Sequence, residues 1–222
     1  MRRFDFVLFD LDGTLLDTKE GILAAAVRTM EEYRLPIPDD DALEAMIGPP
    51  VQESYAKLFA LAPEAAMEMA NRFRDRYKTA EYLFRAEPYD GIFDLLQALK
   101  DTGTGIGIAT YKREDYARRL LCAKGFDRYT EHMYGSDFEG KLKKADIIRL
   151  CLEKMGCADP LRAVYIGDGK SDGTGAAAVG MPFLAVTYGF GFKTSADAEP
   201  YHPIGVAQTC MQVKDLILGS AD

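Results

Sequence analysis

Hydrophobic and polar residues follow a regular alternation over the second part of this chain. From residue 88 onward, short apolar runs separate stretches in which apolar residues recur at helical spacing. The runs indicate strands, and the spaced stretches indicate helices. The predicted strands in this part are 105–109, a short one near Met133, 163–167 and 183–186, and an apolar run near the start of the chain predicts one more at 6–9. The predicted helices are 91–100, 114–124, 144–155, 171–179 and 211–218. This order is typical of a parallel sheet covered by helices on both faces.

Residues 18–83 show a different pattern, with helical periodicity and no good strand. One helical face carries Ile22, Ala26, Met30 and Tyr33, and further helical stretches cover 39–47, 51–61 and 63–83. We therefore predict an α/β fold. Its Rossmann-like parallel sheet core contains residues 1–17 and 84–222, and a small helical domain, residues 18–83, is inserted after the first strand.

Composition and charge narrow the class of protein without identifying it. The 222 residues are 48% hydrophobic and 28% charged, which is typical of an ordinary globular protein. The net charge of −8 disfavours binding to nucleic acid or to an anionic membrane surface. Met1-Arg2-Arg3 leads directly into a strand, and no apolar run approaches the roughly 20 residues needed to cross a bilayer. We expect a cytoplasmic protein with a small-molecule partner.

The four cysteines are Cys122, Cys151, Cys157 and Cys210, and none of them forms a C-x-x-C pair. Only two histidines are present, so a zinc site is disfavoured. Reduced thiols that pack as small apolar side chains are the simpler interpretation.

The end of the first strand carries the most informative motif, in which Asp10 and Asp12 occupy alternate positions. Side chains at such positions leave an extended strand on the same face. Two carboxylates that close repel each other unless a cation lies between them. Gly13 allows a sharp turn, and Thr14 supplies a hydroxyl for its backbone groups. The motif indicates a hard-cation site with one carboxylate available for chemistry, although alone it could also be a solvated turn.

Polar residues also follow two other predicted strands, and they should meet Asp10 and Asp12 at one edge of the sheet. Thr110 follows 105–109, and Asp168 and Asp172 follow 163–167. The helix that precedes 163–167 opens with a lysine cluster consisting of Lys141, Lys143 and Lys144. Phosphoryl transfer uses a carboxylate nucleophile, a metal, a cation and an acid, and each has a candidate here. A lone threonine more often caps a helix, and most of the lysines should lie on a solvated face.

Together these motifs resemble the haloacid dehalogenase-like superfamily. The resemblance covers essentially the whole chain and rests on four motifs in the family's order, namely Phe9-Asp10-Leu11-Asp12-Gly13-Thr14, Thr110, Lys144 and Gly167-Asp168-Gly169-Lys170-Ser171-Asp172. The helices inserted after the first motif resemble the family's small helical cap domain. Gly48-Pro49-Pro50, Pro88-Tyr89-Asp90-Gly91 and Tyr188-Gly189-Phe190-Gly191 are similar to its phosphoglycolate phosphatase-like branch.

The resemblance implies roles for the acidic residues. Asp10 would attack phosphorus and carry an aspartyl-phosphate, while Asp12 would protonate the leaving oxygen and then deprotonate water. Asp10, Asp168 and the backbone carbonyl of Asp12 would hold Mg²⁺, and Asp172 would bind the metal through water or steady a metal ligand. Dehalogenating relatives lack the second aspartate, so Asp12 favours phosphoester hydrolysis.

The resemblance also implies the substrate-binding groups. Thr110 and backbone N–H groups, including that of Leu11, would bind the phosphoryl oxygens, and Lys144 would neutralise Asp10 and the phosphate. Two departures affect this set. Tyr111 stands where the family commonly has asparagine, so we include Tyr111 at the substrate site in its place. The family's Lys-Pro-x-Pro pattern is absent, and Lys144 is preferred over Lys141 because of its distance from Asp146-Ile147-Ile148.

The sequence therefore predicts a Mg²⁺-dependent phosphatase that acts on a small phosphorylated metabolite. Phosphoglycolate, sugar phosphates and nucleoside monophosphates are candidate substrates in that order. Two alternatives stay open, a sugar phosphomutase resembling β-phosphoglucomutase and a ligand-binding protein that has lost turnover. The oligomeric state is not predicted.

Overall fold

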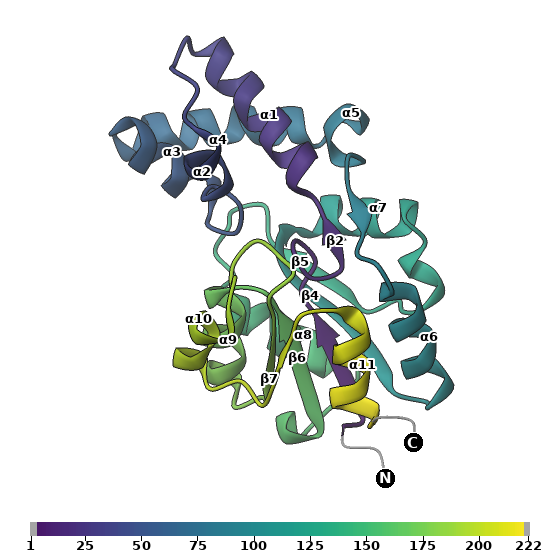
Figure 1. The fold of residues 1–222 in the computed structure, drawn as a ribbon. Coiled ribbons are helices and arrows are strands. Elements are labelled where there is room, and N and C mark those ends of the chain that lie inside the picture. The colour runs from purple at the N-terminus through teal and green to yellow at the C-terminus, as the bar shows by residue number, and fades with distance from the viewer. Residues whose placement is uncertain (1–3, 220–222) are drawn as a thin grey trace. The chain divides into compact units, whose positions relative to one another are not determined.

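A computed structural model describes residues 4–219 of the chain (Figure 1). Residues 1–3 and 220–222 lie outside that range. The prediction that Met1-Arg2-Arg3 leads directly into a strand therefore falls on residues that are not described. The chain divides into two compact units, one formed by Met1–Asp17 and Pro88–Asp222 and the other by Thr18–Glu87. The second unit corresponds to the predicted helical insertion 18–83, and it also includes residues 84–87, which the sequence pattern places in the core.

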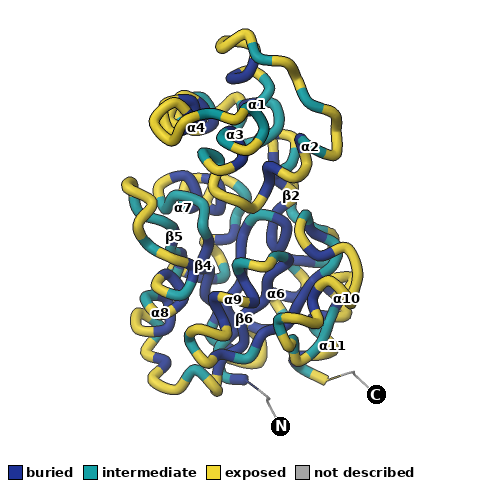
Figure 2. Tube along the Cα trace, turned by 90° about the vertical axis from the view of Figure 1, so that its left-hand side faces the viewer, coloured by how far each residue is buried: buried dark blue, intermediate teal, exposed yellow. Residues whose placement is uncertain are grey.

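The first unit is built on a six-stranded parallel sheet with the strand order β5-β4-β1-β6-β7-β8. The strands are β1 (Phe6–Phe9), β4 (Gly105–Arg113), β5 (Met133–Ser136), β6 (Ala163–Gly167), β7 (Phe183–Val186) and β8 (Val206–Ala207). Most strand residues are buried because helices cover both faces, as the dark blue strands β4 and β6 show in Figure 2. The predicted α/β fold with a parallel sheet is confirmed.

Right-handed crossovers distribute the helices of this unit over the two faces of the sheet. Helices α8 (Lys144–Lys154) and α9 (Lys170–Val179) pack on the face that carries Leu8 and Tyr165. The connections from β1 to β4 and from β4 to β5 run across the sheet in the opposite direction to those from β5 to β6 and from β6 to β7. They place α6 (Ile92–Asp101) and α7 (Glu114–Ala123) on the other face, where α11 (Cys210–Leu218) packs against α6. Shorter elements are α10 (Ser195–Ala198) and the 3₁₀ turns Phe126–Arg128, Pro160–Arg162 and Glu199–Tyr201.

The helical unit contains α1 (Lys19–Glu32), α2 (Asp40–Glu44), α3 (Val51–Phe59), α4 (Pro63–Tyr77) and α5 (Ala80–Leu83). Its own core includes Met30, Tyr55 and Met69, all fully or almost fully buried. The predicted helix 63–83 is two helices, because Thr79 has extended backbone geometry and caps the start of α5. Short strands β2 (Leu16–Asp17) and β3 (Glu87–Pro88) pair at the two points where the chain passes between units. Within residues 4–219, no helix is long and apolar enough to cross a membrane.

One strand of the main sheet is longer than predicted, and this affects the site. The apolar run ends at Ala109, but β4 continues to Arg113 and pairs with Ser136 of β5 after a register irregularity. Thr110, Tyr111 and Lys112 therefore lie on extended backbone rather than in a loop. Periodicity could not reveal this extension, because the added residues are polar and aromatic and only pairing with β5 keeps them extended.

Candidate active site

The carboxyl ends of three neighbouring strands bring the predicted residues to one edge of the sheet. Strand β1 lies between β4 and β6, and Phe9 is in register with Ile108 and with Ile166. Asp10 follows β1 directly, and its N–H donates to the Ile166 carbonyl at 2.9 Å. The parallel register thus places Asp10 beside the Thr110 end of β4 and the Asp168 end of β6.

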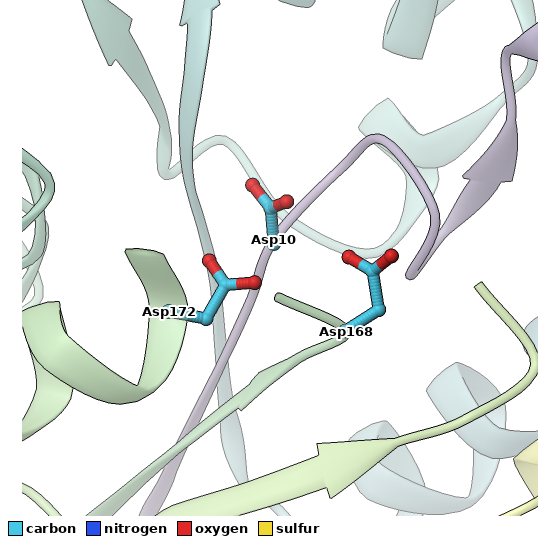
Figure 3. Close-up of side chains that lie close together, drawn as sticks. All are labelled: Asp10, Asp168 and Asp172. Carbon is cyan, nitrogen blue, oxygen red and sulfur yellow. The ribbon is translucent and has the colours of Figure 1, made fainter. Parts of the chain in front are cut away.

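Three carboxylates gather there, those of Asp10, Asp168 and Asp172 (Figure 3). One oxygen of each lies within 4.8 Å of those of the other two, and all three residues are buried. Burial raises the pKa of Asp10 to about 6, against the effect of Lys144 and with help from the charges of Asp172 and Asp12. Burial and the charges of Asp172 and Asp10 raise the pKa of Asp168 to about 7. So much buried negative charge requires a cation.

Lys144 supplies one cation at the start of α8. Its Nζ lies 2.8 Å from Asp10 Oδ1 and 2.8 Å from Asp172 Oδ1, and its side chain is only 3% exposed. Burial opposes the charge of this ammonium, but Asp10 and Asp172 outweigh that effect and hold the pKa of Lys144 well above its usual value. Lys141 and Lys143 are exposed, and Lys141 pairs with Glu139. Of the three lysines, the structure brings Lys144 to Asp10.

A glycine-rich loop after β7 holds Asp168 in place. The Asp168 Oδ2 accepts hydrogen bonds from the backbone N–H groups of Phe190 at 2.6 Å and Gly191 at 2.9 Å. A Cβ at Gly189 would lie 2.1 Å from the Gly13 carbonyl oxygen, so only glycine allows this close approach. Sequence reasoning noted this segment as a branch signature but missed its role in fixing Asp168. Gly189 and Gly191, two residues apart after a buried strand, were the available signal.

Asp12 lies apart from the three clustered carboxylates and has its own lysine. Its Oδ1 is 2.9 Å from Lys112 Nζ, and the two side chains are 19% and 5% exposed. The negative charge of Asp12 still affects Asp10, because it helps to raise the pKa of the Asp10 carboxyl group. The sequence analysis missed Lys112. Its position two residues after Thr110 could have indicated a shared strand face, had β4 been expected to extend that far.

The remaining predicted substrate-binding residues lie close to this cluster. Thr110 is buried, and its Oγ1 accepts a hydrogen bond from the Lys112 N–H at 3.1 Å. The Tyr111 ring faces the ammonium of Lys144, with Nζ 5.2 Å from the ring centroid. Leu11 has a fully buried side chain, and its carbonyl accepts N–H groups of the following turn, including that of Leu15 at 3.0 Å.

Comparison with known proteins identifies the family. Residues 7–186 match the family described as haloacid dehalogenase-like hydrolase. The chain belongs to that family. The match begins in β1 and ends in β7, so it includes all of the clustered acidic residues and Lys144.

Relatives of this hydrolase include several phosphatases. The chain is 34% identical over 202 residues to a 5′-nucleotidase from Pseudomonas aeruginosa, and the aligned residues cover 90% of each protein. It is 32% identical over 200 residues to a phosphoglycolate phosphatase from Agrobacterium fabrum, covering 87% of this chain and 84% of the relative. The crystal structure of a predicted phosphatase from Clostridium acetobutylicum is similar with a TM-score of 0.89 and 31% identity, over 98% of this chain and 99% of that one. These similarities indicate a phosphoric monoester hydrolase.

The donor atoms of the hydrolase fit a hard divalent cation such as Mg²⁺. All ligand candidates in the acidic cluster are carboxylates, and Mg²⁺ prefers oxygen ligands. Asp10 Oδ1 is held by Lys144 and Asp168 Oδ2 by backbone N–H groups, whereas Asp168 Oδ1 has only a long hydrogen bond from Thr14 Oγ1, at 3.5 Å, that a metal could replace. Both oxygens of Asp172 are engaged, Oδ1 by Lys144 and Oδ2 by the Gly169 N–H at 2.9 Å. Asp172 is therefore better placed to hold Lys144 than to bind the metal directly.

Mg²⁺ is expected to stabilise the folded hydrolase, because its charge would reduce the repulsion among the buried carboxylates of Asp10, Asp168 and Asp172. At a concentration ten times its dissociation constant, Mg²⁺ should raise the melting temperature by about 3 °C over protein in EDTA. Asp168→Asn should abolish that shift while leaving the EDTA melting temperature unchanged or higher, because it removes one repelling charge. Differential scanning calorimetry measures both effects.

Asp127→Asn provides the matched control, since Asp127 is exposed on a 3₁₀ turn outside the acidic cluster. This variant should keep the full Mg²⁺ shift. An equal shift in Asp168→Asn and wild type would show that Asp168 does not hold the metal.

Proposed function

We propose that this hydrolase is a Mg²⁺-dependent phosphatase that acts on a small phosphorylated metabolite through an aspartyl-phosphate on Asp10. The observation that carries the proposal is the buried Asp10 carboxylate with Oδ1 held by Lys144 at 2.8 Å. That contact fixes one oxygen and leaves Oδ2 as the oxygen that we assign to attack on phosphorus. A carboxylate nucleophile divides phosphoester hydrolysis into two easier displacements.

Each displacement uses Asp10 and Asp12 in complementary roles. Asp10 Oδ2 first attacks phosphorus, the bond from phosphorus to the leaving oxygen breaks, and Asp12 gives that oxygen its proton. Asp12 then takes a proton from water as the water oxygen attacks phosphorus, and the bond to Asp10 breaks to release inorganic phosphate. Before substrate binds, Lys112 holds the Asp12 carboxylate at 2.9 Å, so Asp12 has to take up a proton from solvent or from the substrate phosphate before it acts as the acid.

The other residues reduce the cost of bringing two anions together. Lys144 offsets the charge of Asp10 and of the phosphoryl oxygens, and we assign Thr110 and the Leu11 N–H to those oxygens. Asp10, Asp168 and the Asp12 carbonyl would hold Mg²⁺, which neutralises phosphoryl charge during attack. Tyr111 lies against Lys144, so we assign it to shaping this end of the substrate site.

The candidate substrates are taken from the phosphoryl-transfer chemistry assigned to the site and from the relatives. Phosphoglycolate and nucleoside monophosphates correspond to the names of two relatives, and sugar phosphates complete the panel. A cap role for the helical insertion belongs to the same proposal, supported by its place directly after the first motif. A cytoplasmic location also remains proposed, and the four free thiols support it.

Phosphate release from a panel of these esters tests the proposal. At least one compound should be hydrolysed with Mg²⁺, and EDTA should remove the activity. Conversion of a sugar 1-phosphate to its 6-phosphate, with a bisphosphate requirement, would instead favour the mutase alternative. Tight binding of a phosphate mimic without any turnover would favour the ligand-binding alternative.

A further inference from the structure

Tyr165 is a fully buried tyrosine that the mechanism above does not use. It lies in the middle of β6, on the sheet face that α8 covers, and it is in register with Leu8 of β1. Its hydroxyl donates a hydrogen bond to the Ala109 carbonyl of β4. Because β1 lies between β4 and β6, the side chain spans one strand to reach its partner.

The same hydroxyl also accepts a hydrogen bond from Lys144 Nζ at 3.2 Å. An ammonium group has three donors. In Lys144 the ammonium donates hydrogen bonds to Asp10 Oδ1 and to the Tyr165 hydroxyl, and it also forms an ion pair with Asp172 Oδ1 at 2.8 Å. The Tyr165 and Tyr111 ring centroids lie 5.6 Å and 5.2 Å from Nζ. Several groups thus hold the ammonium in position, and only two of them, Asp10 and Asp172, are carboxylates.

We propose that Tyr165 is a positioning residue that aims the Lys144 ammonium and ties it to the phosphate-binding end of β4. Ala109 directly precedes Thr110, so the hydroxyl links Lys144 to the strand that carries the predicted phosphate ligand. This bridge sets the spacing between Lys144 and Thr110 before substrate binds. Fixed spacing matters because preorganised donors stabilise a developing charge without reorganising during the reaction.

The inference rests on the proposed function for what Lys144 and Thr110 bind, whereas the hydrogen bonds themselves do not depend on it. A tyrosine that served only to fill space would tolerate phenylalanine with no effect on Lys144. Tyr165→Phe keeps the ring and removes only the hydroxyl that bridges Lys144 and Ala109. The substitution therefore separates packing from positioning.

Tyr134→Phe is the matched control, because it makes the same chemical change at a partly buried tyrosine of strand β5 in the same sheet. Both variants are assayed well below their melting temperatures, after urea unfolding has confirmed that they are folded. Tyr165→Phe should lower kcat about tenfold and change KM less than about twofold. Tyr134→Phe should change neither value. Unchanged kcat in Tyr165→Phe, or a rise in KM alone, would overturn the inference.

A second readout follows Lys144 without any substrate. In ¹H–¹⁵N spectra of the lysine ammonium groups, the buried Lys144 should give a slowly exchanging signal that Lys144→Met identifies by its loss. Tyr165→Phe should broaden that signal or speed its exchange, and Tyr134→Phe should not. An unchanged signal in Tyr165→Phe would also overturn the inference. If the wild type hydrolyses no phosphoester, the proposed function fails and the ammonium signal alone decides the role of Tyr165.

Discussion

Asp10→Asn is expected to abolish phosphatase turnover while the protein remains folded. The amide is nearly isosteric with the carboxylate but cannot form the acyl-phosphate, so kcat should fall by at least about 10³-fold. The fold should survive, because the substituted side chain is a neutral group and Lys144 keeps its contact with Asp172 at 2.8 Å. Initial rates with the best substrate of the panel, together with the melting temperature, measure both parts.

Asp17→Asn is the appropriate control, since Asp17 is an exposed residue of β2 a short distance further along the chain. It should retain wild-type turnover. If Asp10→Asn kept more than about a tenth of wild-type activity, Asp10 could not be the nucleophile, and another group would have to carry the phosphoryl transfer.

Lys144→Met is expected to reduce stability and activity together. Removing the ammonium leaves the buried carboxylates of Asp10 and Asp172 without their shared partner, which should lower the free energy of unfolding in EDTA by about 3–5 kcal/mol. Turnover should fall strongly, because nothing then offsets the charge of Asp10 as a phosphate approaches. Urea unfolding in EDTA and in Mg²⁺, with initial rates, measures these effects, and Mg²⁺ should recover part of the stability.

Two further variants separate charge from packing. Adding Asp172→Asn to Lys144→Met should restore part of the lost stability by removing one unpaired charge, without restoring turnover. Lys141→Met changes an exposed lysine of the same segment and should alter stability by less than about 0.5 kcal/mol. If Lys141→Met impaired turnover as strongly as Lys144→Met, the wrong lysine would have been assigned to Asp10.

Much of the site could be predicted from sequence because its residues follow apolar strands. Parallel strands end at one edge, so identifying 6–9 and 163–167 as strands was enough to bring Asp10 and Asp168 together. The alternation of strands and helices likewise determined the α/β class. Local patterns suffice here because each conclusion depends on a short segment and on the general geometry of parallel sheets.

Other features depend on long-range contacts that no local pattern contains. Choosing Lys144 over Lys143 requires the phase of α8 relative to β1, since a step of one residue turns a side chain about 100° around the helix axis. Tyr165 lies within the predicted strand 163–167, and only the path of β4 shows that its hydroxyl reaches Ala109. The pairing of Asp12 with Lys112 depends on β4 continuing beyond its apolar run.

The sequence by itself thus determined the fold class, the order of the motifs and the acidic residues at the strand ends, because strand periodicity and chain order express them directly. Only the tertiary structure decided which lysine neutralises Asp10, how the loop at Phe190 and Gly191 fixes Asp168, and which oxygens remain for a metal. Those features are set by distances of a few ångströms between residues far apart in the chain, and packing determines such distances.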